Sequence, residues 1–275
     1  MRFLTTHRRV LVTAATVTFA ATALLAGSGM GVAAAASTTP VTVWLAGDST
    51  VANSSSGGIV GWGGKFKPYF NASVTVNNQA VAGRSIQTWL YEGNVSSTKN
   101  SAGECSLSST AYSSRWTSMQ SSFKSGDWLI VQFGINDGDP ACPRHVGSAR
   151  YQQLLGVMAK AAQAKGVHVI FNTPVAAITC SGSTAVGNRG FLTDTKTAAN
   201  ANGVPVIDLH ALSLNLYNQL KLCPNNSDYT STTSAVGKFF ANDHTHFSAD
   251  GAPQIAGLVA RATRDQGLGL SAWLN

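Results

Sequence analysis

Short apolar runs alternate with longer amphipathic stretches along most of the chain. Five of the runs are rich in β-branched residues and have the length of strands, namely residues 41–47, 74–83, 127–134, 166–174 and 203–210. Most are apolar at successive positions, which is typical of strands covered by helices on both faces. Strands that alternate with helical segments favour a parallel sheet joined by crossover helices. The pattern therefore predicts an α/β fold.

Two further segments have a helical pattern. Residues 151–166 repeat apolar side chains at helical spacing and end at Gly166, which suits a helix end. Residues 248–266 also predict a helix, and Pro253 is compatible with it only in the first turn. The sequence contains no internal repeat and no long linker. We therefore expect one domain over residues 37–275.

Polar or small residues directly follow the first three runs. These residues are Ser49 in GDST, Gly83 in AVAGRS and Asn136 in FGIND. Ligands of open parallel sheets bind beyond the carboxyl ends of the strands, so all three could face one cleft. A serine there offers a hydroxyl, a glycine a close backbone N–H and an asparagine an amide donor. Each residue type is also common in ordinary turns, so no single one of them identifies a site.

The segment DHTH, residues 243–246, places a carboxylate and two imidazoles together. A serine hydroxyl needs an imidazole to take its proton, and the imidazole needs a carboxylate to fix its tautomer. Asp243 and His246 are three residues apart, so one turn can pair them. The spacing predicts that they activate Ser49. His244, between them, should point away from His246 and is structural or substrate-adjacent.

A metal site is the alternative interpretation of DHTH. Asp243, His244 and His246 could act as ligands, because metals use His-x-His spacing. No second acidic or histidine cluster completes the coordination shell. We therefore expect neither a metal nor an organic cofactor.

The first 36 residues differ in composition from the rest. Three arginines precede a long Ala/Val/Leu/Thr stretch and a run of small residues that ends at Ala36. This layout predicts a secretory signal peptide and a secreted protein. A membrane anchor is the alternative, but no charged residue follows the apolar stretch. Arg8 and Arg9 leave the general secretory and twin-arginine routes both open.

The net charge limits the kinds of partner that we expect, and the cysteine count predicts disulfides. The chain has a net charge of +7, and because residues 1–36 hold three arginines and no acid, the remainder carries +4. Its cations are scattered, so we expect no binding to nucleic acid. We also expect no membrane contact after signal removal, and a monomer. Four cysteines in an exported chain predict two disulfides. Of three possible pairings we favour Cys105 with Cys142 and Cys180 with Cys223, because each pair lies in flexible Ser/Gly/Asn/Pro-rich segments.

Taken in order, GDST, AVAGRS, FGIND and DHTH resemble the four blocks of the SGNH (GDSL-like) hydrolases. Longer stretches such as VTVWLAGDSTVA, NQAVAGRSIQTWLYEG and NDHTHFSADGA resemble the rhamnogalacturonan acetylesterases, over essentially the whole chain after the signal. The resemblance implies a three-layer α/β/α sandwich of flavodoxin-like type with about five parallel strands. It also implies an esterase that removes acetyl groups from an acetylated pectic polysaccharide.

The same resemblance assigns roles to individual positions. Ser49 matches the nucleophile, Asp243 the orienting acid and His246 the base, while Gly83, Asn136 and the backbone N–H of Ser49 match the oxyanion hole. Ile135 replaces a histidine that is usual in the family, at a position bordering the acyl or sugar pocket. Trp62, Arg84, Ile135 and His244 are candidates for contact with substrate. Trp62 and Trp89 could stack on sugars or belong to the core.

Two other functions fit the same pattern. One is an esterase of this fold that acts on acetyl-xylan or a lipid. The other is a sugar-binding protein that has kept the scaffold, which the intact set of Ser49, Asn136, Asp243 and His246 argues against.

Overall fold

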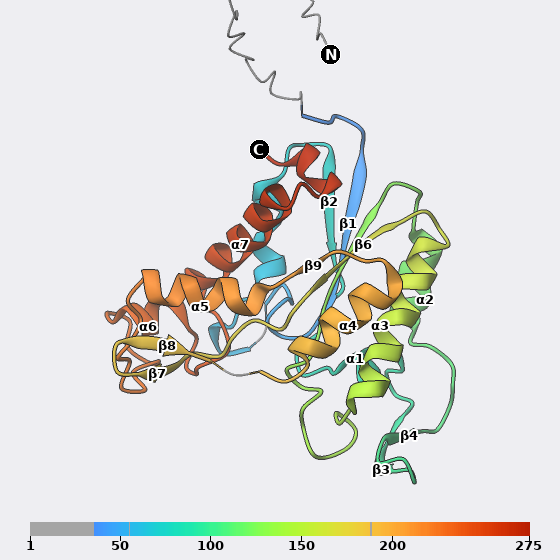
Figure 1. The fold of residues 1–275 in the computed structure, drawn as a ribbon, viewed down its shortest axis with the longest axis horizontal. Helices are drawn as coiled ribbons and strands as arrows, with labels where there is room; N and C mark the ends of the chain where they lie inside the picture. The colour runs from blue at the N-terminus through green and yellow to red at the C-terminus, as the bar shows by residue number, and fades with distance from the viewer. Residues whose placement is uncertain (1–35, 55, 188) are drawn as a thin grey trace, which may run out of the picture. The chain divides into compact units, whose positions relative to one another are not determined.

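A computed structural model describes residues 36–54, 56–187 and 189–275. Its centre is a five-stranded parallel sheet in the order β2-β1-β5-β6-β9 (Figure 1). The strands are β1 (Val41–Gly47), β2 (Val74–Asn78), β5 (Trp128–Gln132), β6 (His168–Asn172) and β9 (Val206–Ile207). All but the last residue of the expected signal peptide lie outside the described residues. The prediction of five parallel strands is confirmed.

Each predicted strand contains an observed one, and most are shorter than predicted. β1 covers its whole run, whereas β2 ends at Asn78 instead of residue 83. The backbone N–H groups of Gln79 and Val81 still donate to Leu45 and Gly47 of β1. The segment leading to Gly83 therefore stays attached to β1 although it no longer forms a regular strand.

Helices cover both faces of the sheet, which confirms the three-layer arrangement (Figure 1). Trp44 and Ala46 of β1 pack on the side of α1 (Ile86–Leu90), α2 (Ser114–Ser122), α3 (Ser148–Gln163) and α4 (Leu192–Asn202). Val43 and Leu45 pack on the side of α5 (Leu209–Gln219), α6 (Ala235–Phe239) and α7 (Gly251–Asp265). Short 3-10 turns lie at Ser56–Gly58, Trp62–Lys65, Lys67–Tyr69 and Gly269–Trp273. The alternation along β1 thus divides the core into two layers.

The two predicted helices are present, with ends shifted by one to three residues. α3 begins three residues earlier than predicted, where both carboxylate oxygens of Glu104 accept the N–H of Gly147. An anion there suits the positive end of the helix. Gly166 lies beyond its end with a φ of 72°. In α7, Pro253 is the third residue and lies in the first turn, as predicted.

Two small antiparallel hairpins were not predicted. They are β3 (Val95–Lys99) with β4 (Cys105–Leu107), and β7 (Thr179–Ser181) with β8 (Thr184–Val186). Disulfides join Cys105 to Cys142 and Cys180 to Cys223, which is the pairing we favoured. Each disulfide attaches one hairpin to a loop that follows a sheet strand or helix. Over the described part of the chain, no helix is both long and apolar enough to span a membrane.

Candidate active site

Ser49 lies in a tight turn at the carboxyl end of strand β1, the second strand of the sheet. The carbonyl of Asp48 accepts the N–H groups of Val51 and Ala52, and its carboxylate accepts both the N–H and the hydroxyl of Thr50. Only 6% of Ser49 is exposed. The turn is therefore held by its own hydrogen bonds, which fixes the direction of the Ser49 hydroxyl.

Hydrogen bonds between buried side chains support this turn. The indole N–H of Trp62 donates to Gln132 over 3.0 Å, and the amide of Gln132 donates to the Thr50 hydroxyl over 2.9 Å. Trp62 has no exposed surface, so it cannot stack on a sugar, and its assignment as a substrate-adjacent residue is wrong. Trp89 is equally buried and also belongs to the core. Trp62 acts instead as a hydrogen-bond donor within the support of the Ser49 turn.

The segment with Asp243 and His246 is a loop closed by core residues. Phe240 and Phe247, both buried, form an antiparallel bridge, and Ala241 donates its N–H to the carbonyl of His246. Inside the loop, one oxygen of Asp243 accepts the N–H groups of Thr245 and His246, each over 2.7 Å. The aromatic pair therefore anchors the loop, and the carboxylate sets its internal conformation.

The second oxygen of Asp243 faces the imidazole. Oδ2 lies 2.6 Å from Nδ1 of His246, and Nε2 of the same ring lies 2.8 Å from Oγ of Ser49. The predicted Ser49, His246 and Asp243 side chains thus form one continuous relay. Burial raises the pKa of Asp243, but hydrogen bonds from the His246 ring and from two backbone N–H groups outweigh burial and lower the pKa to about 2. Asp243 is therefore ionised at every pH above about 4.

The predicted oxyanion donors lie on the loops that follow β2 and β5. Gly83 has a φ of 73°, a left-handed conformation that favours glycine. Nδ2 of Asn136 donates to the carbonyl of Arg84 over 3.1 Å, which leaves its second N–H for a ligand. Within the described part of the chain, the backbone N–H groups of Ser49 and Gly83 donate to no protein acceptor. These three groups are therefore open donors.

Asp137 connects the loop after β2 with the loop after β5 and was not singled out from the sequence. One oxygen accepts the N–H of Ile86, at the start of α1, and the other accepts the N–H of Gly134, each over 2.8 Å. The side chain is fully buried. Burial, together with the nearby charge of Asp48, raises the pKa of Asp137 to about 7 against the effect of its backbone hydrogen bonds. The loop of Gly83 and the loop of Asn136 therefore share one buried carboxyl group.

Asp137 should make the folding stability fall as the pH rises from about 4 to about 7. Its folded pKa of about 7 lies above the ordinary aspartate value of 3.8, so the stability it contributes is complete below pH 3.8 and is lost as the pH rises through 7. We expect the free energy of unfolding of wild type relative to Asp137→Asn to fall by at most about 4 kcal/mol over this range. Urea unfolding of both proteins at several pH values measures the difference. A difference that stays constant with pH, as expected for the exposed control Asp265→Asn, would contradict the role of Asp137.

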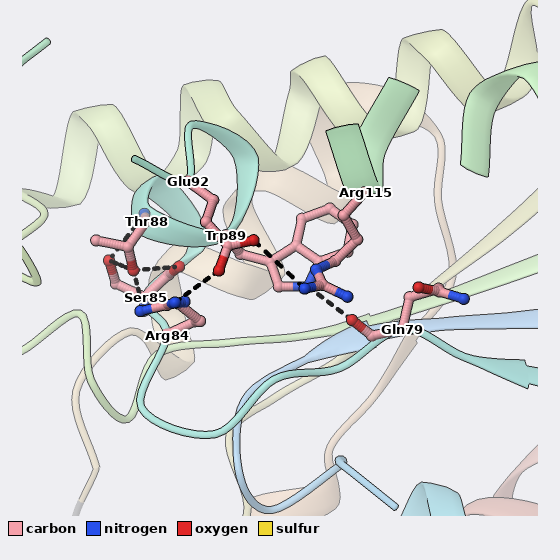
Figure 2. Close-up of polar contacts among 7 residues, drawn as sticks. All are labelled: Gln79, Arg84, Ser85, Thr88, Trp89, Glu92 and Arg115. Carbon is pink, nitrogen blue, oxygen red and sulfur yellow. Dashed lines mark hydrogen bonds and ion pairs between the residues drawn. The ribbon is translucent and has the colours of Figure 1, made fainter. Parts of the chain in front are cut away.

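Arg84 lies beside the site in an ion-pair network. Figure 2 shows Arg84 and Arg115 on the carboxylate of Glu92. Their Nη2 atoms lie 2.6 and 3.3 Å from its oxygens, respectively. Burial raises the pKa of Glu92, but the two guanidinium groups outweigh it and the pKa is lowered. Ser85 and Thr88 form a capping box at the start of α1 in the same view. The carbonyl of Arg84 accepts a hydrogen bond from Asn136, and its side chain forms an ion pair with Glu92 that stabilises the Gly83 loop.

The remaining candidates lie around two cavities. Ile135 lines a cavity of about 380 Å³ together with Asn136. His244 is exposed, lines another of about 480 Å³ with Tyr229, and accepts the N–H of Ile178 on its carbonyl. Among the described residues, no three His, Cys, Asp or Glu side chains are grouped as metal ligands would be. Both ring nitrogens of His246 face protein partners instead, Ser49 and Asp243.

Comparison with known proteins places this geometry among hydrolases. The model of the GDSL-like Lipase/Acylhydrolase family matches residues 45–252. A rhamnogalacturonan acetylesterase of Bacillus subtilis is 29% identical over 245 residues, which is 84% of this chain and 93% of the relative.

Two solved structures share the fold. The protein YXIM of Bacillus subtilis matches with a TM-score of 0.66 and 23% identity over 84% of this chain, and the match spans only 58% of that protein. An acetylxylan esterase of Geobacillus stearothermophilus matches with a TM-score of 0.52 and 15% identity, over 84% of this chain and 95% of the esterase.

Proposed function

Because the chain belongs to the GDSL-like lipase/acylhydrolase family, we propose that it is a secreted serine esterase that removes O-acetyl groups from plant cell-wall polysaccharide, with rhamnogalacturonan as its substrate. The observation that supports this most directly is the relay from Asp243 through His246 to the Ser49 hydroxyl. The similarity to a rhamnogalacturonan acetylesterase supports the choice of ester and polymer. The two disulfides suit a secreted protein.

In the first step, Ser49 Oγ attacks the carbonyl carbon of the acetyl group while Nε2 of His246 takes the hydroxyl proton. Asp243 holds the imidazole in the tautomer with its proton on Nδ1 and stabilises the ring once it is charged. The tetrahedral intermediate then collapses, and His246 returns the proton to the departing sugar oxygen. The products are a free sugar hydroxyl and an acetyl group on Ser49.

In the second step, water replaces the sugar. His246 takes a proton from the water as it attacks the acetyl group, and the proton returns to Ser49 Oγ as acetate leaves. Negative charge develops on the carbonyl oxygen in both steps. The N–H groups of Ser49, Gly83 and Asn136 are the proposed donors to that charge, and donors held in place before the reaction lower the barrier most.

The test is acetate release from acetylated rhamnogalacturonan and from acetylated xylan, by the chain without its first 36 residues and by its Ser49→Ala variant. We expect release from rhamnogalacturonan that a chelator does not change and that falls about a thousandfold or more in the variant. Release by the variant at the wild-type rate would exclude the serine mechanism. Release from xylan alone would replace the proposed polymer with the alternative one.

A lipid ester is a less suitable substrate for this surface. Among the described residues, the large hydrophobic side chains that are exposed are Tyr112, Val186 and Leu220, which come from three different segments. A lipid chain needs a continuous apolar groove. We therefore propose a polar polymer as the substrate.

A further inference from the structure

We propose that the cavity beside Asn136 is a subsite for the carboxylate of an acidic sugar in the polysaccharide, with Arg144 and Arg189 as its cations. The inference rests on the proposed function, since it concerns the substrate of the same site. The cavity measures about 380 Å³, and its wall includes Ile135, Asn136 and both arginines. A sugar bound there would lie next to the amide that we assign to the oxyanion hole.

Arg189 presents a guanidinium group that is already oriented. Its Nε donates to the carbonyl of Val175 over 3.1 Å, and its Nη2 donates to the Thr245 hydroxyl over 2.7 Å. Nη1 makes no hydrogen bond to any of the described residues. Burial lowers the pKa of Arg189 and the nearby Asp48 and Asp243 oppose this, but a guanidinium keeps its charge in proteins. A fixed cation loses little side-chain entropy when an anion binds.

Arg144 supplies the second cation from the loop after β5. It forms an ion pair with Asp139, and its Nη1 lies 3.4 Å from Oδ1 of Asn136. A guanidinium has five N–H donors, so these contacts leave donors for a ligand. The disulfide between Cys105 and Cys142 joins this loop to β4. Arg144 is therefore held near the reacting end of the cavity although 47% of its side chain is exposed.

The charges of the cavity wall favour a single carboxylate. Arg144 and Arg189 contribute two positive charges and Asp139 one negative charge, so one positive charge is in excess. Ile135 adds an apolar surface on which the C–H groups of a sugar ring can pack. Rhamnogalacturonan contains a uronate in every repeat, whereas the xylan backbone consists of neutral pentoses. The subsite would therefore distinguish the two candidate polymers by charge.

Calorimetric titration with unacetylated oligosaccharides tests the subsite without relying on turnover. A galacturonate-containing oligosaccharide should bind the protein about tenfold more tightly than a neutral xylo-oligosaccharide of the same length. Arg144→Gln should weaken binding of the acidic oligosaccharide about five- to tenfold, Arg144→Lys should weaken it less, and added salt should weaken it in the wild type. Arg189 is left unchanged because it also holds Thr245 of the catalytic loop.

The matched control is Arg261→Gln. Arg261 is exposed on α7 and lines a different cavity with Tyr69 and Asn275, so the variant loses the same charge elsewhere. Its affinity for the acidic oligosaccharide should equal that of wild type. Equal affinity for the acidic and neutral oligosaccharides, or an affinity that Arg144→Gln leaves unchanged, would overturn the subsite. Acetate release that survives Ser49→Ala would instead overturn the proposed function, so the two failures are distinguishable.

Discussion

Asp243→Asn is expected to lower kcat for ester hydrolysis by about three to four orders of magnitude while the fold remains intact. The reason lies in how the carboxylate uses its two oxygens. Oδ1 accepts two backbone N–H groups of the loop, and Oδ2 faces Nδ1 of His246. A carboxylate can accept on both sides at once, whereas an amide has one accepting side and one donating side.

Either orientation of the new asparagine should therefore fail. If its oxygen stays on the N–H groups of Thr245 and His246, its NH2 faces Nδ1, and the ring must carry its proton on Nε2. That tautomer cannot take the proton of Ser49. If the amide is reversed, its NH2 meets two backbone N–H groups, and the loop loses the contacts that shape it.

Hydrolysis of 4-nitrophenyl acetate, a small neutral ester, measures the effect without involving polysaccharide binding. Asp250→Asn is the matched control, because Asp250 is exposed at the start of α7 and caps no helix N–H group with its side chain. Its kcat should stay within about twofold of wild type, as for most surface substitutions. A kcat for Asp243→Asn within tenfold of wild type would mean that Asp243 does not orient the base.

Local patterns made much of this site predictable from the sequence. Apolar runs located the strands, and the rule for the carboxyl ends of parallel strands placed Ser49, Gly83 and Asn136 at one edge. The spacing of Asp243 and His246 gave their pairing, because both lie in one short loop. The Ser49 turn and this loop are 197 residues apart along the chain, and the resemblance to a known family was needed to assign their roles together.

Contacts between distant segments could not be predicted in the same way. Trp62 follows a glycine in a loop and gives no sign of burial, because its partner Gln132 is 70 residues away. Asp137 looks like an ordinary turn residue after Asn136. One of its carboxylate oxygens nevertheless accepts the N–H of Ile86, which lies 51 residues earlier. Arg189 contacts the loop of Asp243 and His246 through a hydrogen bond to Thr245, 56 residues later in the chain. Such residues stabilise the site through tertiary contacts that leave no periodic pattern.

Asn136→Ala is expected to lower kcat by about a hundred- to a thousandfold, with little change in KM for a small ester. The amide is held on both sides, by the carbonyl of Arg84 on Nδ2 and by Arg144 on Oδ1. One N–H therefore points in a fixed direction before substrate arrives. Because negative charge is greater on the carbonyl oxygen in the transition state than in the bound ester, this donor should act mainly on kcat.

Steady-state kinetics with 4-nitrophenyl acetate, together with thermal unfolding, separates this role from a structural one. Asn136→Asp keeps the size of the side chain but replaces the donor with a negative charge, so its kcat should fall at least as far as that of Asn136→Ala. Both variants should retain a cooperative unfolding transition, since Asn136 is only partly buried and Asp137 still joins the two loops. If Asn136→Ala kept kcat within threefold of wild type, the backbone N–H groups of Ser49 and Gly83 would have to stabilise the oxyanion alone.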